Sequence, residues 1–406
     1  SSVDNSKIFF YNRISDLGIF FSIFILYSLT KSYDFEIILN DNYYIRNDNY
    51  HLMGFKFKIS EFSVFLLFFS YLLRLRQFFV ADCIYDLRNI NTPALTQIFC
   101  SIYIPAGLYI LMRFLPLVHN THNFLNIMII LGFIITIILI FLSLSENNYK
   151  LLISYIVCSQ FSIITFFIGF KAYEGAVFYL MTTSLSITMI FLCMGTISSK
   201  LGEENDISKM GSLFYKLPTT FLFMIIAIFS IIGIPYFVGF YSKELIMFSP
   251  YISNKNNMLL PLILNFIVSL MLSYILSKNI LLIFWSKNNC NIHYYNKIEE
   301  SSFLLKFIFL ILALILVTSG WFFGHMFSSS DAKNFWYLIL NIKIHLPFIQ
   351  QDTIPPLIKN SMIYTSIFGI LIAFFNYTII PILRNSIKLK HNKVFVFYIK
   401  QFLKIH

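Results

Sequence analysis

The chain has 406 residues, of which 58% are hydrophobic and only 12% are charged, and its mean hydropathy is +0.74. Because soluble domains carry about 25% charged residues, this composition excludes a soluble globular protein and indicates an integral membrane protein. The net charge of +11 is scattered between apolar runs, which is typical of topology and lipid-headgroup signals, so we expect membrane lipids and no nucleic acid as partners. The five cysteines have no paired spacing, so we expect no disulfide framework and no metal site.

About ten apolar runs are long enough to cross a bilayer, since a spanning helix needs roughly 17–25 residues. They predict an all-α fold, a polytopic transmembrane helical bundle. The seventh run is too long for one straight helix, and Pro235 and Gly239 predict a helix break inside it. In chain order the runs lie near 8–30, 59–82, 94–115, 124–145, 149–170, 174–198, 216–249, 259–286, 303–326 and 360–385.

A polar linker at 200–215 divides the chain into a first part, 1–199, and a second part, 200–385, followed by a basic tail at 386–406. Each part contains a predicted interrupted helix with a basic residue: Arg74 in the helix near 59–93, and Lys243 in the helix at 216–249. Paired interrupted helices are typical of transporters with a site at the membrane midplane. The Lys and Arg bias of the loops predicts that both termini face the negative compartment, cytosol or matrix.

Lys243 and Glu244 stand in apolar surroundings just after the predicted break. An ionisable residue at membrane depth is expected to be functional, although a lysine that snorkels from a helix end is the alternative. Arginine does not lose its proton in proteins. Arg74 is therefore either a fixed charge beside an ion path or half of a buried ion pair with Asp82 or Asp86 that holds the helix. Arg13 and Asp16 are three apart on a helix, which predicts a structural ion pair.

The segment Gly233-Ile-Pro-Tyr-Phe-Val-Gly-Phe-Tyr-Ser-Lys-Glu244 resembles a signature of chain 5 of the proton-pumping NADH–quinone oxidoreductase, respiratory complex I. That chain is an antiporter-like membrane subunit with interrupted helices. Weaker matches follow in the same order as in that family: Asn12-Arg13 with Asp16 and Gly18, Gln77, Asp86, Thr92-Pro93, Ala106-Gly107 with Tyr109, Tyr155, Ser159-Gln160, and Phe191-Leu192-Cys193 with Gly195.

The resemblance implies a multi-pass subunit of the mitochondrial inner membrane, part of the H⁺-translocating NADH:ubiquinone reductase of the respiratory electron-transport chain. It implies that Lys243, Glu244 and Arg74 serve the proton path or its electrostatics, with the helix break at Pro235 and Gly239. It also implies that FMN, the iron–sulfur clusters and quinone belong to other subunits, with no cofactor on this chain. Phe99, Tyr179, Thr183 and Ile187 replace titratable residues of the family, which predicts weakened pumping.

The family has five further spans before the position of Tyr11, and a lateral helix after its last span. We therefore expect this chain to be the C-terminal portion of a split antiporter-like subunit. We expect a separate polypeptide with the missing N-terminal spans to pack against the 8–30 helix, beside other membrane-arm subunits of complex I. Two alternatives stay open: a structural scaffold subunit of the same complex that does not pump, and a cation/proton antiporter large subunit.

Overall fold

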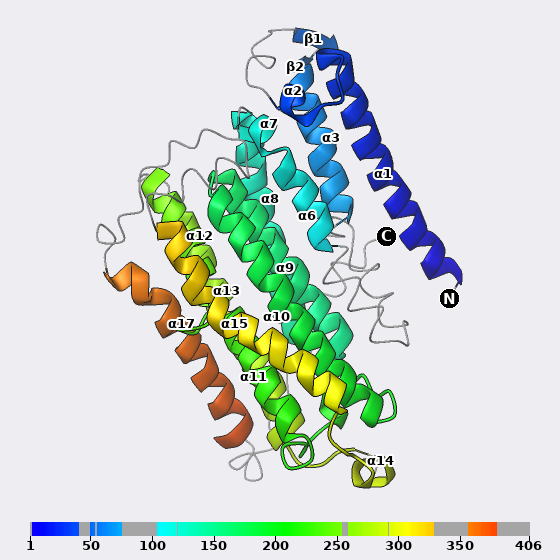
Figure 1. Ribbon diagram of the computed structural model, residues 1–406, viewed down its shortest axis with the longest axis vertical. Coiled ribbons are helices and arrows are strands. Elements are labelled where there is room, and N and C mark those ends of the chain that lie inside the picture. Colours follow the sequence, from blue (N-terminus) through cyan, green and yellow to red (C-terminus); the bar gives the residue numbers. More distant parts are fainter. Residues whose placement is uncertain are drawn as a thin grey trace.

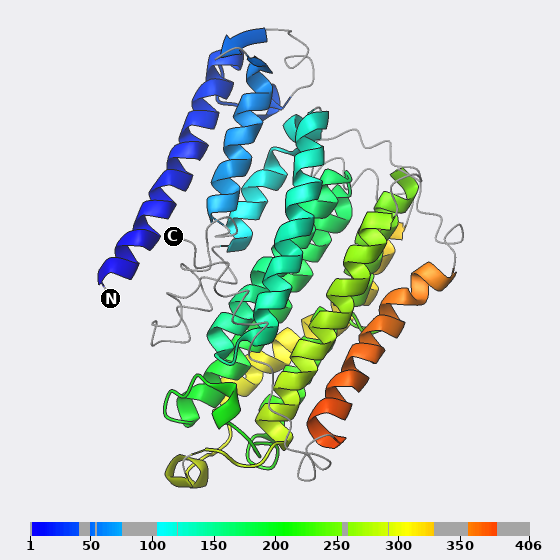
Figure 2. The ribbon, with the colours of Figure 1, turned by 180° about the vertical axis from the view of Figure 1, so that it is seen from behind.

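The computed structural model describes residues 2–39, 49–52, 55–74, 104–119, 121–253, 259–290, 292–328 and 356–379. These residues form a bundle of long, roughly aligned helices (Figures 1 and 2). Within the described part of the chain, seven helices are long and apolar enough to cross a membrane. The predicted polytopic helical bundle is therefore confirmed, with one short antiparallel hairpin outside the spans, β1 (Asn49–Leu52) and β2 (Phe55–Lys58).

The helices follow the predicted runs closely. In chain order they are α1 (Ser2–Thr30), α2 (Phe35–Ile38), α3 (Ile59–Arg74), α6 (Ile104–Arg113), α7 (Leu115–His119), α8 (His122–Ser145), α9 (Tyr149–Gly169), α10 (Tyr173–Lys200), α11 (Pro218–Ile232), α12 (Val238–Ser253), α13 (Leu259–Ile280) with the π-helical turn η6 (Leu281–Trp285), α14 (Ile292–Asn296), α15 (Phe303–Ser328), and α17 (Pro356–Phe374) with the π-helical turn η8 (Phe375–Ile379).

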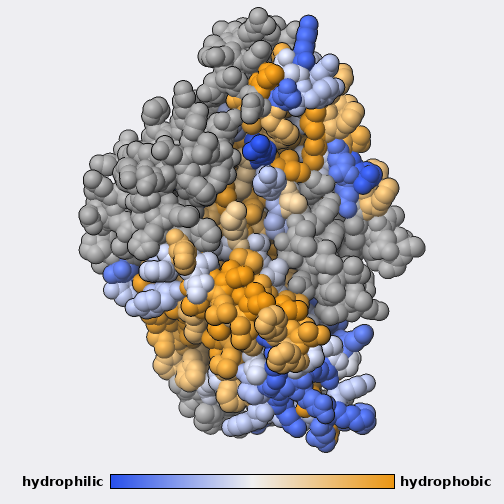
Figure 3. Space-filling view, in the orientation of Figure 1, coloured by the Kyte–Doolittle hydropathy of each residue, from blue (hydrophilic) through white to orange (hydrophobic). Residues whose placement is uncertain are grey.

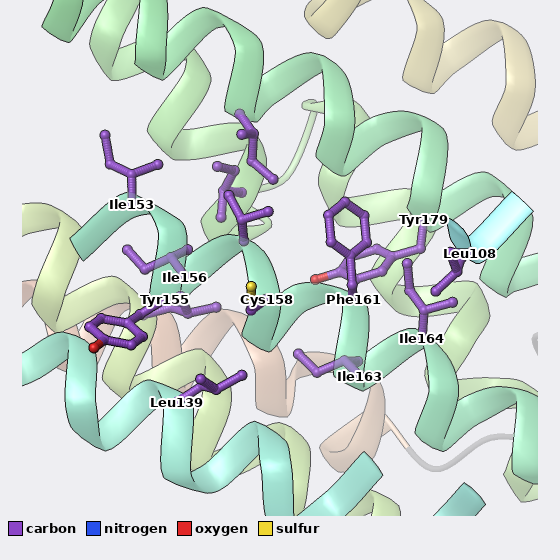
Figure 4. Close-up of a cluster of buried hydrophobic side chains, with 14 of the residues drawn as sticks. Leu108, Leu139, Ile153, Tyr155, Ile156, Cys158, Phe161, Ile163, Ile164 and Tyr179 are labelled. Atoms are coloured by element: carbon purple, nitrogen blue, oxygen red, sulfur yellow. The ribbon is translucent and has the colours of Figure 1, made fainter. Parts of the chain in front are cut away.

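Helix α9 lies at the centre of the bundle, and each of its residues is buried. A helix that is apolar all round is expected to be enclosed by other helices, and α9 packs against α8 and α10. Figure 4 shows part of the resulting core, in which Phe161 and Ile164 of α9 lie near Tyr179 of α10. Helix α1, in contrast, lies at the edge of the bundle and exposes Phe20 and Phe24.

The predicted interruption of the seventh run is present, since α11 ends at Ile232 and α12 begins at Val238. The earlier interruption, predicted near 59–93, falls mainly outside the described residues, which include that run only up to the end of α3 at Arg74. The broken pair α11 and α12 packs against both α10 and α15. Both half-helices therefore pack against neighbouring helices, while Tyr236 in the turn between them is 82% exposed.

Polar side chains gather at one end of the molecule, around α14 and its flanking loops, below a broad apolar belt (Figure 3). At this end a carboxylate from one loop caps a helix. The backbone N–H of Thr219, in the first turn of α11, donates to Oε1 of Glu300 at 3.1 Å, and Lys306 of α15 forms an ion pair with the same carboxylate. A negative charge is favourable at a helix N-terminus, where backbone N–H groups have no partner within the helix. This contact fixes the start of the broken helix.

Candidate functional site

The ammonium group of Lys243 lies against the C-terminal end of α11. Its Nζ donates hydrogen bonds to the carbonyl oxygen of Ile231 at 2.6 Å and to that of Ile232 at 3.0 Å, and the side chain is only 7% exposed. The last carbonyls of a helix have no partner within it, and the helix dipole places partial negative charge there. The broken helix thus provides a cation site inside the bundle, and the charge of Lys243 occupies it.

Two glycines allow this contact. Gly233 ends α11 in the left-handed conformation (φ 85°, ψ 48°), which glycine adopts without steric cost. Gly239 lies in the first turn of α12, where a Cβ atom would be 1.8 Å from the carbonyl oxygen of Ser230. The close approach of the two half-helices therefore requires glycine at position 239. Pro235, which has no N–H to donate, lies in the turn between them.

A small cavity adjoins Lys243, with about 20 Å³ open to the centre of a water molecule. That volume is enough for one water, since about 10–15 Å³ is needed. Tyr179 of α10 and Asn265 of α13 contribute polar side chains to its lining. An ammonium group has three N–H donors, and two of those of Lys243 bind carbonyls. The third is available to a water molecule in the cavity.

Tyr179 connects this cavity with the central helix. Its hydroxyl donates to the side-chain Oε1 of Gln160 on α9, and both residues are buried. Figure 4 shows the Tyr179 side chain extending toward α9 beside Phe161. On another side of α9, two residues further along, the hydroxyl groups of Ser162 and Thr136 are 3.0 Å apart and join α9 to α8. The polar contacts of α9 with α10 and with α8 are thus separate from each other.

The hydroxyl residues of α10 have two different roles. Thr182 reaches across to Ser242 of α12, with 3.0 Å between the two oxygens, and so fastens α10 to the residue next to Lys243. Thr183 and Ser186 instead donate to carbonyls of their own helix, as hydroxyl side chains commonly do in membrane helices.

The remaining predicted site residues lie in three places. Glu244 is buried beside Lys243 in sequence, but adjacent residues on a helix do not face one another. Arg74 is the last residue of α3, and its side chain and its suggested partners Asp82 and Asp86 lie outside the described residues, as does Phe99.

The predicted pair on α1 lies apart from the broken helix. Arg13 Nη2 and Asp16 Oδ2 are 3.0 Å apart, and the side chains are 60% and 37% exposed, respectively. The ring of Phe9 also lies beneath the Arg13 guanidinium, 5.2 Å from centroid to Cζ.

Sequence reasoning missed three features of the site. It did not anticipate that the carbonyls of Ile231 and Ile232 hold the ammonium, although a helix that ends just before a buried lysine is a signal for it. It took Tyr179 only as a lost titratable residue, whereas Tyr179 lines the cavity beside Lys243. It gave Gln160 no role beyond a family match, and no pattern in one sequence pairs Gln160 with Tyr179.

The arrangement can hold one positive charge at the end of a half-helix and supply it with a single water molecule. A lysine suits such a site because it can exist as ammonium or as neutral amine when buried. Tyr179, Gln160 and the hydroxyl groups can orient water and pass hydrogen bonds along without carrying charge.

Comparison with known proteins gives consistent relatives. Residues 5–267 match the family model described as "NADH:quinone oxidoreductase/Mrp antiporter, TM". The chain is 26% identical over 374 residues to NADH-ubiquinone oxidoreductase chain 5 of Chondrus crispus. The aligned region covers 90% of this chain and 55% of that protein. It is 33% identical over 165 residues to the protein of the same name from Canis lupus familiaris, covering 41% of this chain and 27% of that one. The chain thus spans about half the length of the first curated relatives that it matches.

A solved structure of the Mrp complex from a Dietzia species has the same fold. Its similarity extends over 98% of this chain and 42% of that chain, with a TM-score of 0.72 and 14% sequence identity. At this level of identity the likeness concerns the arrangement of the helices alone.

Proposed function

Because the chain belongs to the NADH:quinone oxidoreductase/Mrp antiporter family of membrane proteins, we propose that it serves in respiratory complex I. There it acts as an antiporter-like membrane-arm subunit, or a large part of one, that contributes to proton translocation coupled to NADH oxidation by ubiquinone. The relatives named chain 5 of NADH-ubiquinone oxidoreductase support this choice. These relatives come from eukaryotes, which supports the mitochondrial inner membrane as the location.

The observation that carries the proposal is the buried ammonium of Lys243 at the end of α11. A charge at membrane depth is costly and is usually retained for ion transport. In the proposed mechanism Lys243 accepts a proton from water in the adjoining cavity and releases it when a neighbouring charge changes. The carbonyls of Ile231 and Ile232 favour the charged form, and burial favours the neutral form. Because the two effects oppose each other, a modest change nearby can shift the balance.

Tyr179 and Gln160 connect the Lys243 cavity with the core in this proposal. They do not carry charge near neutral pH, so their part is to order the water next to Lys243. A pump that relies on one lysine and on uncharged polar residues has fewer stations that can hold a proton. This supports weakened or rerouted pumping rather than a full antiporter channel. Redox cofactors and quinone would be bound by other subunits.

The orientation in the membrane follows from the described lysines. Lys200, Lys209, Lys216, Lys287 and Lys297 all lie in loops or at helix ends; Lys200 contacts the carbonyl of Glu299, and Lys216 lies over the ring of Tyr295 on α14. By the positive-inside rule the end of the molecule around α14 faces the matrix. The first residues of α1 point toward the same end (Figure 1).

The outer face of α1 is apolar and exposed. Phe10, Phe20, Phe21 and Phe24 are exposed on it, together with the Arg13–Asp16 pair. We propose that transmembrane helices of a separate polypeptide cover this face. The greater length of the relatives supports the existence of such helices.

The proposal is tested by native electrophoresis of mildly solubilised membranes, with in-gel staining for NADH oxidation and mass spectrometry of the stained band. We expect this chain in the band, together with a second hydrophobic chain that can be chemically cross-linked to α1. Migration of the chain apart from all NADH-oxidising activity would contradict membership of complex I. Its presence in the band without a partner at α1 would contradict the split-subunit part alone.

A further inference from the structure

Helices α11, α13 and α17 enclose an apolar groove of about 410 Å³ on the side of α11 away from Lys243. This volume lies within the range of about 300–1,000 Å³ that is usual for ligand pockets. Its walls come from Ile225, Ile228, Phe229 and Ile232 of α11, from Ser277, Ile280, Leu281 and Trp285 of α13 and η6, and from Ile370, Phe374 and Thr378 of α17 and η8. Figure 2 shows α13 and α17 side by side along this part of the bundle.

The lining decides the chemical class of ligand. The groove has only two hydroxyl side chains, and both are already bound within their own helices: Ser277 donates to the carbonyl of Ser273 at 2.5 Å, and Thr378 donates to that of Phe374 at 2.6 Å. Apart from the indole N–H of Trp285 at one end of the groove, this lining has no free hydrogen-bond donor to recognise a quinone ring, a sugar or a phosphate. An alkyl chain, which needs no hydrogen bonds, fits such a surface.

The dimensions of the groove match one leaflet of a bilayer. The wall from Ser277 to Trp285 has nine residues, and its eight steps of about 1.5 Å each make it about 12 Å long. The hydrocarbon core of a membrane is about 30 Å thick, so one leaflet is about 15 Å. The groove ends at Trp285, which is 54% exposed, and tryptophan is enriched where membrane meets water. Lys287, also exposed, follows two residues later and is suited to a phosphate group at that level.

The backbone is also unusual at this place. Both π-helical turns of the described chain, η6 and η8, contribute to the groove, through Leu281 and Trp285 and through Thr378. A π-helical turn is rare and is frequently found at functional sites. Because two such turns line the same groove, we interpret the groove as a specific site and not as a packing defect.

We propose that this groove is a binding site for one acyl chain of a membrane phospholipid, with the phosphate near Lys287 and the chain end near Ile232. The site touches the candidate proton site through a single residue. The side chain of Ile232 lines the groove, and its carbonyl accepts a hydrogen bond from Lys243. A bound acyl chain therefore packs against the end of α11 from behind and keeps it in place for Lys243. The binding itself does not depend on the proposed proton pumping.

The test uses the intact complex in phosphatidylcholine vesicles that contain a small fraction of phosphatidylcholine with a photoreactive diazirine in one acyl chain. After illumination, labelled peptides are mapped by mass spectrometry. We expect groove residues of α11, α13 and α17 to be labelled at low fractions of the probe and to reach saturation. Labelling of the exposed face of α15, at Leu314 for example, should instead rise in proportion to the probe.

Ile370→Trp fills the groove and should lower labelling there at least fivefold, whereas Leu314→Trp on the exposed face of α15 should leave it unchanged. Proportional labelling at both places, with no effect of Ile370→Trp, would mean ordinary contact with bulk lipid and would overturn the proposal. An unlabelled groove that cross-links to another polypeptide would overturn it as well. The saturation measurement needs no variant, so the test stands even where Ile370→Trp does not assemble.

Discussion

Replacement of Gly239 by alanine should separate the two half-helices and release Lys243. The added Cβ would lie 1.8 Å from the carbonyl oxygen of Ser230 and 2.7 Å from its carbon, so the helices must move apart by more than 1 Å (about the overlap of a methyl group and a carbonyl). Overpacking of this kind costs about 1–3 kcal/mol. The same movement stretches the 2.6 Å and 3.0 Å hydrogen bonds of Lys243, and each bond to a charged group contributes about 1.5–3 kcal/mol.

We therefore expect Gly239→Ala to destabilise the protein by about 4–9 kcal/mol when both hydrogen bonds are lost, and by at least the overpacking cost of about 1–3 kcal/mol when they survive; we also expect it to lower proton pumping. Gly18→Ala on α1 is the control, because it also replaces a helical glycine by alanine and so gives the same gain in helix propensity as Gly239→Ala. The atom nearest to its new Cβ is the Cβ of Ser70 at 3.0 Å, and a small shift relieves that contact. The measurements are the thermal midpoint of the purified complex and the proton-to-electron ratio in vesicles. Equal midpoints and equal ratios for Gly239→Ala and Gly18→Ala would refute the close approach of the half-helices as the basis of the site.

Two further predictions concern Tyr179 and Glu300. Tyr179→Phe removes the hydrogen bond to Gln160 at a cost of about 1 kcal/mol, so we expect normal assembly with a lower proton-to-electron ratio; an unchanged ratio would show that Tyr179 only packs. Burial alone raises the pKa of Glu300, but hydrogen bonds from Lys306 and from Thr219 outweigh it and lower this pKa below its usual value of 4.5. The carboxylate therefore stabilises the folded protein fully above pH 4.5, and this stabilisation is lost as the pH falls through the lower folded-state pKa. We expect Glu300→Gln to lower the thermal midpoint at pH 7 by an amount that disappears on acidification; a difference that persists in acid would contradict this sign.

The sequence predicted the parts of the fold that depend on local pattern. Apolar runs located the spans, and Pro235 with Gly233 and Gly239 located the break, because these residues limit helix continuation wherever they occur. The position of Lys243 beyond the break could likewise be predicted. Its partners could not, since backbone carbonyls leave no mark in a sequence. The contact between Tyr179 and Gln160 depends on which sides of α9 and α10 face each other. A helix that is apolar on all sides has no distinct polar face, so its sequence does not specify how it is rotated toward its neighbours.

The apolar groove could not be predicted from the sequence either. Ile228, Ile280 and Ile370 look like any lipid-facing isoleucine in their helices. Only their convergence from three separate helices, and the π-helical turns at η6 and η8, distinguish them. Nothing in the sequence around residues 281–285 or 375–379 departs from an ordinary helical pattern.

The most direct test of the account is the proton-to-electron ratio of complex I with Lys243→Met, measured in sealed vesicles during NADH oxidation. Methionine keeps most of the side-chain volume and removes the ammonium, while Lys209→Met, at an exposed loop lysine paired with Glu204, controls for loss of charge. Lys243→Arg retains the charge but does not release a proton. The account predicts a lowered ratio for both Lys243 variants, with NADH oxidation retained and Lys209→Met normal. A wild-type ratio in Lys243→Met would contradict it and leave this subunit a scaffold.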